Sequence, residues 1–504
     1  MILIKGTMET VMFFDRRFIE KALPTAQILF DYFPHDISFS IDSRTLFPGD
    51  MFIALSGNRV DGHQYVKEVL QDKNAGGVII EKDKKDTLNS ISPTLLQKKL
   101  IILVDNVVEG LLQLAGAWRA QWNIPVIGLT GSFGKTVTRE KIALLLQKNN
   151  ISYISSSQNH NSLIGLPLSI LKMRGHHEMA IFEMGINKRG EMEKLADVLQ
   201  PTIGIITGIG HSHLEGLGSL NDIAVEKRNI FKNFSEHNIG IINGDQSQLA
   251  KVSYSHPVIK FGMKTTNQIQ ARKIQVKSSH IDFILKIYQD KYPVRLDTNH
   301  EGAITTSLAI AAIGSLLKFN HGTILDAIQT PVSVSGRYQQ LTLKDNKGIL
   351  INDCYNANPE SMKMALLAFD KLDTPYEKIA IIGDMLELGI DASFWHRQLG
   401  RFLKKTPTIK KVILVGKHIK LAQEALPAGV ESELVGTAEQ GLKALKKYMK
   451  KPLAVFVKAS NSIGLSLIVD EIAEKQNTFA AATKTDSITA NHNGNQTLNS
   501  IGTH

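Results

Sequence analysis

Several residue types that define other classes of protein are scarce in this chain of 504 residues. It contains one cysteine, Cys354, which excludes an internal disulfide and a cysteine-rich zinc site. Aromatic residues make up 7% of the chain and do not alternate with its lysine runs, which disfavours a nucleic-acid-binding surface. No apolar run reaches the roughly 18 residues of a membrane span, and the first residues lack a signal-peptide pattern. The sequence therefore predicts a cytoplasmic protein with no membrane span and no nucleic-acid partner.

The rest of the composition is that of an ordinary globular protein, with 43% hydrophobic and 21% charged residues. This balance excludes wholesale disorder, collagen and coiled coil. At about 150 residues per domain, the length predicts roughly three domains. The 58 basic and 48 acidic residues give a net charge of +10, which would suit a small anionic substrate.

Short apolar runs bounded by turn residues alternate with stretches of helical spacing along most of the chain. We expect strands at residues 37–41, 51–55, 77–80, 100–104, 124–129, 179–184, 202–209, 239–243, 349–352, 379–383, 411–416 and 453–457, and helices at 65–73, 107–122, 137–147, 189–199 and 221–234. This alternation is typical of α/β proteins with doubly wound, mostly parallel sheets. We expect three domains: a small N-terminal α/β domain at 1–106, a central P-loop-type domain at 107–330 and a C-terminal Rossmann-like α/β domain at 331–474. Residues 475–504, rich in Asn and Thr, are expected to form a disordered tail.

The strongest local signal is the segment Thr-Gly-Ser-Phe-Gly-Lys-Thr at residues 130–136, which follows an apolar strand and precedes a helix. In such a turn, backbone N–H groups and the helix N-terminus can bind phosphate oxygens. Lys135 can reach the β- and γ-phosphates, and the hydroxyl of Thr136 can bind Mg²⁺. The spacing departs from the strict phosphate loop, because Leu129 stands where its first glycine is expected. The flanking strand and helix still favour phosphate binding over a chance glycine-rich turn.

Two further side chains follow predicted strands of the central domain. Glu183 closes one strand and His213 follows another, so both could face a metal ion at the carboxyl edge of the sheet. Taken singly, each residue also fits a plain surface position. His211 and His213 lack a third Cys or His at a spacing that would predict zinc.

Strings of residues in all three predicted domains resemble the Mur ligase family, over about residues 30–470. They lie at residues 42–46, 49–55, 130–136, 159–168, 182–185, 212–219, 226–227, 335–337, 353–362 and 383–389. The loop at 130–136 is common to the family. Two strings, Tyr-Asn-Ala-Asn-Pro at 355–359 and Gly-Asp-Met-Leu-Glu-Leu-Gly at 383–389, resemble the member that adds a dipeptide.

The resemblance implies an ATP-dependent ligase of peptidoglycan precursor synthesis that acts as a monomer on UDP-MurNAc-tripeptide and D-alanyl-D-alanine. The peptide carboxylate would attack ATP to form an acyl phosphate, and the amine of the dipeptide would then displace phosphate. Because two anions must meet in the first step, cations have to neutralise their approach. ATP and Mg²⁺ are the implied cofactors.

The resemblance also implies roles for individual residues. ATP would contact Gly131, Ser132, Gly134, Lys135, Thr136, Arg337 and Asp353. Mg²⁺ would be held by Thr136 and Glu183 at one site and by His213 and a carbamylated Lys227 at a second. The sugar-peptide substrate would contact Ser43, Arg44, Asn159, Asn161, Asn356 and Asn358, the first two at its uridine diphosphate end. Lys135, His213, Lys227 and Arg337 are the expected catalytic residues.

The chain departs from the usual pattern of the family at several positions. Residues 302–306 replace a His-Asn-x-x-Asn motif, which removes expected amide contacts to the nucleotide base. Ser162 and Gly208 each stand where Asn is usual, and Asn461 where Arg is usual. Because the expected phosphate and metal positions remain intact, we still expect an active enzyme.

Three other hypotheses stay open at this point. The chain could be the related ligase that adds the third amino acid, although it lacks the Asp-Asn-Pro-Arg string associated with diaminopimelate. It could be a nucleotide-binding module that performs no ligation, or an inactive ligase.

Overall fold

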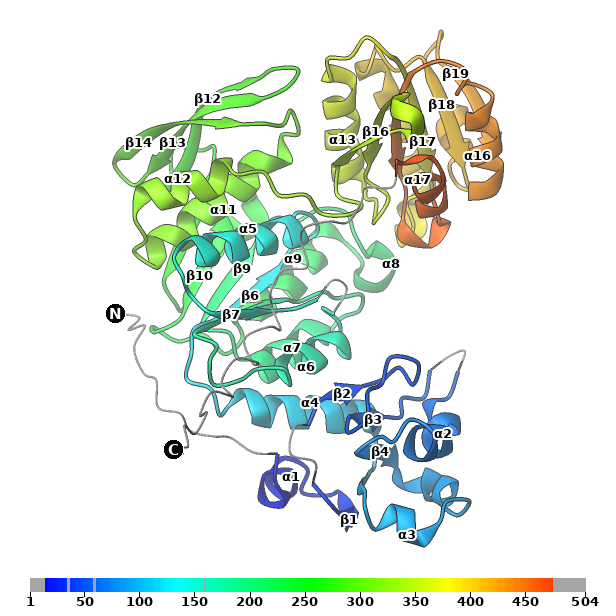
Figure 1. The fold of residues 1–504 in the computed structure, drawn as a ribbon. Helices are drawn as coiled ribbons and strands as arrows, with labels where there is room; N and C mark the ends of the chain where they lie inside the picture. Colours follow the sequence, from blue (N-terminus) through cyan, green and yellow to red (C-terminus); the bar gives the residue numbers. More distant parts are fainter. Residues whose placement is uncertain (1–13, 34–36, 58–59, 158–159, 475–504) are drawn as a thin grey trace, which may run out of the picture.

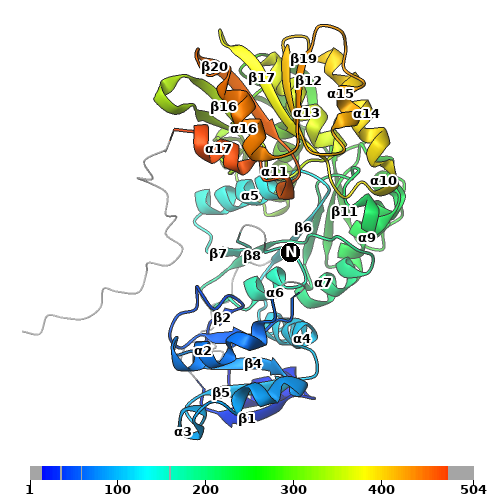
Figure 2. The same ribbon diagram turned by 90° about the vertical axis from the view of Figure 1, so that its right-hand side faces the viewer.

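The computed structural model describes residues 14–33, 37–57, 60–157 and 160–474 of the chain. Three sheets, each flanked by helices, lie one after another along the molecule, with the N-terminal sheet at one end and the C-terminal sheet at the other (Figures 1 and 2). The predicted α/β class with mostly parallel sheets is confirmed. No helix in the described ranges combines the length and apolar character needed to cross a bilayer.

The N-terminal sheet has five strands in the order β1-β5-β4-β3-β2. They are β1 (Gln27–Asp31), β2 (Phe39–Ser40), β3 (Met51–Ile53), β4 (Gly77–Glu81) and β5 (Leu100–Val104), and only the β1–β5 pair is antiparallel. The accompanying helices are α1 (Arg16–Ala22), α2 (Val66–Gln71), α3 (Pro93–Leu96) and α4 (Val107–Arg119). Helix α4 lies between the N-terminal sheet and the central domain in both views.

The central sheet has nine strands in the order β14-β13-β12-β11-β10-β9-β6-β8-β7. They are β6 (Val126–Thr130), β7 (Tyr153–Ser155), β8 (Met179–Glu183), β9 (Ile203–Ile206), β10 (Ile239–Asn243), β11 (Val258–Gly262), β12 (Ile269–Val276), β13 (Ile281–Ile287) and β14 (Asp290–Leu296). Strands from β7 to β12 pair in parallel, whereas β12, β13 and β14 form an antiparallel extension. The buried strands β6, β8 and β9 are almost wholly apolar, as expected for a parallel sheet covered on both faces.

Helices cover both faces of the central sheet. One face carries α5 (Lys135–Lys148), α11 (Gly302–Leu316) and α12 (His321–Gln329), which pack on one another and share an apolar core with the sheet. The remaining helices are α6 (Gly165–Ile170), α7 (Glu191–Leu199), α8 (Leu214–Leu217), α9 (Leu220–Arg228) and α10 (Ser247–Ala250). Helix α4 packs against α6 and α7 and so joins the N-terminal domain to the central one.

The C-terminal sheet has six strands in the order β15-β16-β20-β17-β18-β19. They are β15 (Gln339–Thr342), β16 (Gly348–Asn352), β17 (Glu377–Gly383), β18 (Lys411–Val415), β19 (Glu431–Val435) and β20 (Leu453–Lys458), with only β15 antiparallel. Its helices are α13 (Pro359–Lys371), α14 (Ala392–Phe402), α15 (Lys420–Gln423), α16 (Ala438–Lys446) and α17 (Ser466–Ile472). Helix α13 begins with a capping box between Asn358 and Ser361 and has Pro359 in its first turn, two signals that fix its start.

The structure corrects several expectations. Residues 269–296 do not continue the alternation of strands and helices, because they form the antiparallel extension β12–β14. The strand expected at 202–209 ends at Ile206, and the helix expected at 221–234 ends at Arg228. The expected tail at 475–504 lies outside the described residues.

Candidate active site

The loop that joins β6 to α5 lies at the carboxyl edge of the central sheet and is shaped by two glycines. A side chain at Gly131, which has φ +151°, would meet the hydroxyl of Thr207 at 2.0 Å. Gly134 precedes α5 with φ +79°, a conformation that other residues rarely adopt. The backbone therefore turns tightly enough to present the N–H groups of the first turn of α5, which have no acceptor within the helix. This is the geometry of an anion site at a helix N-terminus.

Lys135 opens α5, and its side chain folds back over this loop. Its Nζ donates to the carbonyl of Gly131 at 2.5 Å. Burial lowers the pKa of Lys135 to about 8, with repulsion from Arg337 adding to the effect and attraction by Glu183 opposing it. The sequence predicts that the cation of Lys135 contacts phosphate. In the structure the Lys135 ammonium group lies over the loop.

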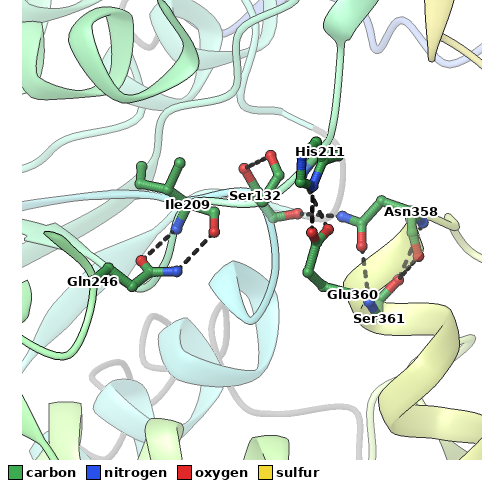
Figure 3. Close-up of polar contacts among 8 residues, drawn as sticks. Ser132, Ile209, His211, Gln246, Asn358, Glu360 and Ser361 are labelled. Atoms are coloured by element: carbon green, nitrogen blue, oxygen red, sulfur yellow. Dashed lines mark hydrogen bonds and ion pairs between the residues drawn. The ribbon is translucent and has the colours of Figure 1, made fainter. Parts of the chain in front are cut away.

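Ser132 is held by the segment that follows β9. Its N–H donates to the carbonyl of Gly208 at 2.8 Å. Its hydroxyl donates to the carbonyl of Gly210 at 2.9 Å (Figure 3). Because both donors are used inside the protein, the phosphate-binding N–H groups are expected to come from the start of α5. Ser132 thus shapes the loop.

Glu183 ends β8 and lies beside the first turn of α5. The hydroxyl of Thr136 donates to its Oε2 at 3.4 Å, and Arg139 Nη1 lies 3.3 Å from its Oε1. The Glu183 and Arg139 side chains are only 5% and 3% exposed. Sequence reasoning missed Arg139, although it stands one helical turn after Lys135 on the same helix, which could have placed it near Glu183.

A divalent cation fits this arrangement. A buried carboxylate next to a hydroxyl supplies the oxygen ligands that Mg²⁺ prefers, and Mg²⁺ commonly takes its remaining ligands from waters and phosphates. In the described part of the chain, no three His, Cys, Asp or Glu side chains cluster closely enough to hold a metal by themselves. Thr136 and Glu183 could therefore hold Mg²⁺ together with a nucleotide.

The second predicted metal pair is placed differently. Lys227, near the end of α9, is 1% exposed, and burial together with repulsion from Lys135 moves its pKa far below the usual range for lysine. His213 lies just before α8 with φ +56°, and its Nδ1 contacts Glu387 of the C-terminal domain. The structure records no direct contact between His213 and Lys227.

A cavity of about 680 Å³ lies between the central and C-terminal domains. It brings together nine of the residues expected from the sequence, namely Ser132, Gly134, Lys135, Asn161, His213, Arg337, Asp353, Asn356 and Asn358. Residues from two domains thus line one partly open cavity, as the sequence prediction of a nucleotide held from both sides requires.

Two C-terminal residues of this cavity are already engaged by their own domain. Asp353 forms a 2.7 Å ion pair with the buried Lys458 and accepts the N–H of Tyr338 at 3.0 Å. The guanidinium of Arg337 lies 3.8 Å from the centre of the Tyr355 ring. Burial lowers the pKa of Arg337, although Asp353 opposes the shift. Arg337 belongs to the C-terminal domain and interacts electrostatically with Lys135 and Glu183 of the central domain.

Other predicted residues lie elsewhere. Ser43 and Arg44 belong to the N-terminal domain and do not line the cavity, and Arg44 pairs with Asp42 at 2.7 Å. Gly131, Thr136, Glu183 and Lys227 are not among the residues that line the cavity. Asn159 lies outside the described residues.

The structure gives a physical reason for two of the departures from the family pattern. A side chain at Gly208 would meet the ring of Phe133 at 2.6 Å, so Phe133 fills the space that a larger residue would take. A side chain at Gly302 would meet the ring of His300 at 2.7 Å. His300 lines the cavity, with its ring centre 4.7 Å from that of Tyr338.

Asn299, next to His300, also lines the cavity and was not expected from the sequence. Its amide donates to the carbonyl of Ser278 at 2.9 Å and to that of Ala368 in α13 at 2.7 Å. It therefore connects the antiparallel extension to the C-terminal domain. The one available signal was an Asn-His pair immediately before α11.

Comparisons with known proteins give one consistent result. Three family descriptions match: "Mur ligase family, catalytic domain" at residues 38–119, "Mur ligase middle domain" at 129–316 and "Mur ligase, glutamate ligase domain" at 336–461. A UDP-N-acetylmuramoyl-tripeptide–D-alanyl-D-alanine ligase from Rickettsia prowazekii is 32% identical, over 85% of this chain and 93% of its own. The ligase of the same name from Escherichia coli is 29% identical, over 86% and 93%.

Solved structures agree with this result. The crystal structure of MurF from Acinetobacter baumannii superimposes with a TM-score of 0.78 at 24% identity, covering 91% of this chain and 98% of that one. The MurF ligase of Thermotoga maritima, solved in complex with ADP, gives a TM-score of 0.73 at 25% identity, covering 86% and 96%. The likeness extends over all three domains.

Proposed function

The chain belongs to the Mur ligase family, and we propose that it joins D-alanyl-D-alanine to the peptide carboxylate of UDP-MurNAc-tripeptide at the expense of ATP. It is an ATP-dependent ligase that forms a C–N bond. The names of its relatives favour the dipeptide-adding reaction over addition of the third amino acid. The observation that carries the proposal is the cavity in which Lys135 and Arg337 meet from two domains.

The chemistry needs two steps. A carboxylate oxygen of the tripeptide attacks the γ-phosphorus of ATP, which forms an acyl phosphate and releases ADP. The dipeptide amine then attacks the acyl carbon, expels phosphate and loses a proton as the C–N bond forms. Lys135 and Arg337 face the space where the two anions meet, so their charges lower the repulsion between them. Docking of the two domains around this space keeps water from the acyl phosphate.

Mg²⁺ is the metal that this site suits, with Thr136 and Glu183 as its protein ligands. When bound, it would neutralise charge on the phosphates. Arg139 holds Glu183 in place from the opposite side, through the 3.3 Å contact between Nη1 and Oε1. Arg139 therefore holds the Glu183 carboxylate in this orientation whether or not a nucleotide is present.

The N-terminal domain is proposed to bind the uridine diphosphate end of the substrate. Ser43 and Arg44 lie together in a turn before β3, where the Asp42 carboxylate accepts both the backbone N–H and the guanidinium of Arg44. Asn161 lines the cavity beside Gly185 and is proposed to contact the sugar-peptide portion. These roles would place the substrate along the line of the three domains.

Lys227 is proposed to carry a carbamate. Its deep burial beside Lys135 disfavours the ammonium form. The neutral amine can attack carbon dioxide, forming an N–C bond and losing one proton, and the resulting anion would face the positive charge of Lys135. The test is Lys227→Ala, which should lose activity at least about a hundredfold and recover part of it with added acetate. Lys232→Ala, at an exposed lysine paired with Asp197, is the matched control.

Incorporation of ¹³C-bicarbonate offers a readout independent of activity. A carbamate carbon resonance in the wild type that is lost in Lys227→Ala supports the proposal. Full activity of Lys227→Ala without added acid would contradict it.

The overall reaction is tested by incubating the protein with ATP, Mg²⁺, UDP-MurNAc-tripeptide and D-alanyl-D-alanine. We expect the pentapeptide product by mass spectrometry and phosphate release that depends on both acceptor and donor. Replacing the tripeptide by UDP-MurNAc-dipeptide and the D-alanyl-D-alanine by single amino acids separates this activity from addition of the third residue. Nucleotide binding without phosphate release under all these conditions would refute the proposal.

A further inference from the structure

We infer that Glu360, in the first turn of α13, is a positioning residue that docks the C-terminal domain onto the ATP-binding loop. The inference rests on the proposed function, because it assigns the loop at 131–134 to ATP. It concerns a residue that sequence reasoning did not single out. Its carboxylate acts on the loop through His211 and the segment that contains it, here called the docking segment, residues 208–211.

Glu360 contacts the docking segment through both of its carboxylate oxygens (Figure 3). Its Oε2 accepts the backbone N–H of His211 at 3.0 Å, and its Oε1 lies 2.5 Å from Nδ1 of the His211 ring. The Trp395 ring packs against that imidazole with the ring centres 4.4 Å apart. The side chains of Glu360 and His211 are 30% and 24% exposed, so the contact is largely shielded from water. One carboxylate thus fixes both the backbone and the ring of a residue in another domain.

The docking segment connects Glu360 to the loop at 131–134 through hydrogen bonds to Ser132. Ser132 donates its N–H to the carbonyl of Gly208 and its hydroxyl to the carbonyl of Gly210, so two residues of the docking segment hold it. The Ser132 carbonyl in turn accepts the amide of Asn358, which lies two residues before Glu360. All three polar groups of Ser132 are therefore engaged, one of them directly by the C-terminal domain.

The docking segment is itself built to receive Glu360. The side-chain amide of Gln246 donates to the carbonyl of Ile209 and accepts the N–H of Ile209, each at 2.7 Å. These two hydrogen bonds hold the backbone of the docking segment in place. A side chain at Gly210 would meet Glu360 Oε2 at 2.8 Å. A Cβ there would force the Glu360 carboxylate to shift, so glycine at position 210 leaves room for the carboxylate where it lies.

The consequence is that nucleotide binding and domain docking reinforce each other. When Glu360 is engaged, the loop at 131–134 is held in one shape; a nucleotide bound to that shape favours the docked arrangement in return. Loss of Glu360 should weaken nucleotide binding more than it slows the reaction once nucleotide is saturating. A residue that merely supported the fold would instead lower the amount of active enzyme and leave the KM for ATP unchanged.

The test uses Glu360→Gln, which keeps the size of the side chain and removes its charge. We expect the Kd for ADP, measured by calorimetry, and the KM for ATP to rise about tenfold, the scale on which a charge-assisted hydrogen bond contributes. We expect kcat at saturating ATP to stay within about twofold and the urea unfolding midpoint to stay close to that of the wild type. Glu439→Gln is the matched control, because Glu439 holds the same second position in α16 and is exposed.

A double-mutant cycle, with His211→Asn measured alone and combined with Glu360→Gln, tests the route through His211. His211→Asn added to Glu360→Gln should weaken ADP binding by no more than about a further twofold, because both changes break one contact. Unchanged ADP binding in Glu360→Gln, or fully additive losses in the double variant, would overturn the inference. Because ADP binding needs neither acceptor nor donor substrate, a wild type that binds ADP without making pentapeptide would refute the proposed function alone.

Discussion

Charged side chains at the carboxyl edge of the central sheet are sealed from water, whereas those that join the central and C-terminal domains are partly exposed. Arg139 and Glu183 are 3% and 5% exposed, but His213 and Glu387, which meet across the domains, are 19% and 53% exposed. Buried charges are costly to separate, and pairs at the surface contribute little each. The buried pair holds the site in one geometry. The partly exposed pairs let the two domains separate and dock at little cost in free energy. A ligase that must admit large substrates and then exclude water needs both.

The largest expected effect comes from removing the charge of Lys135 at the carboxyl edge of the central sheet. Lys135→Ala should lower kcat/KM about 10²- to 10³-fold, because a preorganised cation at the phosphates is lost. Thermal unfolding should be little changed, since Lys135 is held by one bond to a loop carbonyl. Lys148→Ala, in the last turn of the same helix, is the control, because Lys148 pairs with Asp326 away from the cavity. Turnover close to that of the wild type would remove Lys135 from the site.

The contrast between the two regions also explains what the sequence could predict. The site at the carboxyl edge of the central sheet is formed by short segments at strand ends. The sequence motif at residues 130–136 and the position of Glu183 therefore predicted it directly. The interface depends on residues far apart in the chain: Glu360 meets His211 across 149 positions. No local pattern links two such residues, because each follows only the rules of its own helix or loop.

The fold shows the same division. Most strands of the parallel sheets were predicted within a few residues, because buried parallel strands read as continuous apolar runs. The less buried strands β7, β11 and β19 were not predicted. The extension β12–β14 was missed, because β14 contains Pro293 and a charged face, with the burial of an edge strand rather than a core strand. Its residues nevertheless reach the cavity through Ser278 and Leu296.

The next effect concerns the buried ion pair behind the proposed metal site. Arg139→Met should lower the free energy of unfolding by about 3 kcal/mol, because it removes the cation in direct contact with the buried Glu183 carboxylate. Arg139→Lys should lose less, since a cation remains. Urea unfolding measures the difference, and Mn²⁺ titration with ADP shows whether Glu183 still binds metal. Equal stability of Arg139→Met and the wild type would mean that the edge is not sealed as described.

We expect a buried contact between the domains to contribute to the unfolding free energy as the buried Arg139–Glu183 pair does, and more than the exposed contacts beside it. Asn299, 4% exposed, donates to Ser278 and to Ala368. Asn299→Ala should cost about 2 kcal/mol in the urea unfolding of the protein, because the buried carbonyl of Ala368 and the partly buried carbonyl of Ser278 lose their donor. If the loss is below about 0.5 kcal/mol, burial is not what distinguishes the two regions.

The smallest effect is expected two residues further along the chain, where the same two domains meet through an exposed pair. Glu301 lies 3.5 Å from Lys371, and their side chains are 47% and 42% exposed. Water and salt screen such a pair, and holding two long side chains together costs entropy, so its net contribution is small. Glu301→Gln should therefore change the unfolding free energy by less than about 0.5 kcal/mol and the Kd for ADP by less than about twofold, in the same assays as Asn299→Ala. Because both residues precede α11 and contact α13, position in the fold is matched and exposure is the main difference between them. A loss from Glu301→Gln as large as that from Asn299→Ala would show that charge across the interface, rather than burial, holds the domains together.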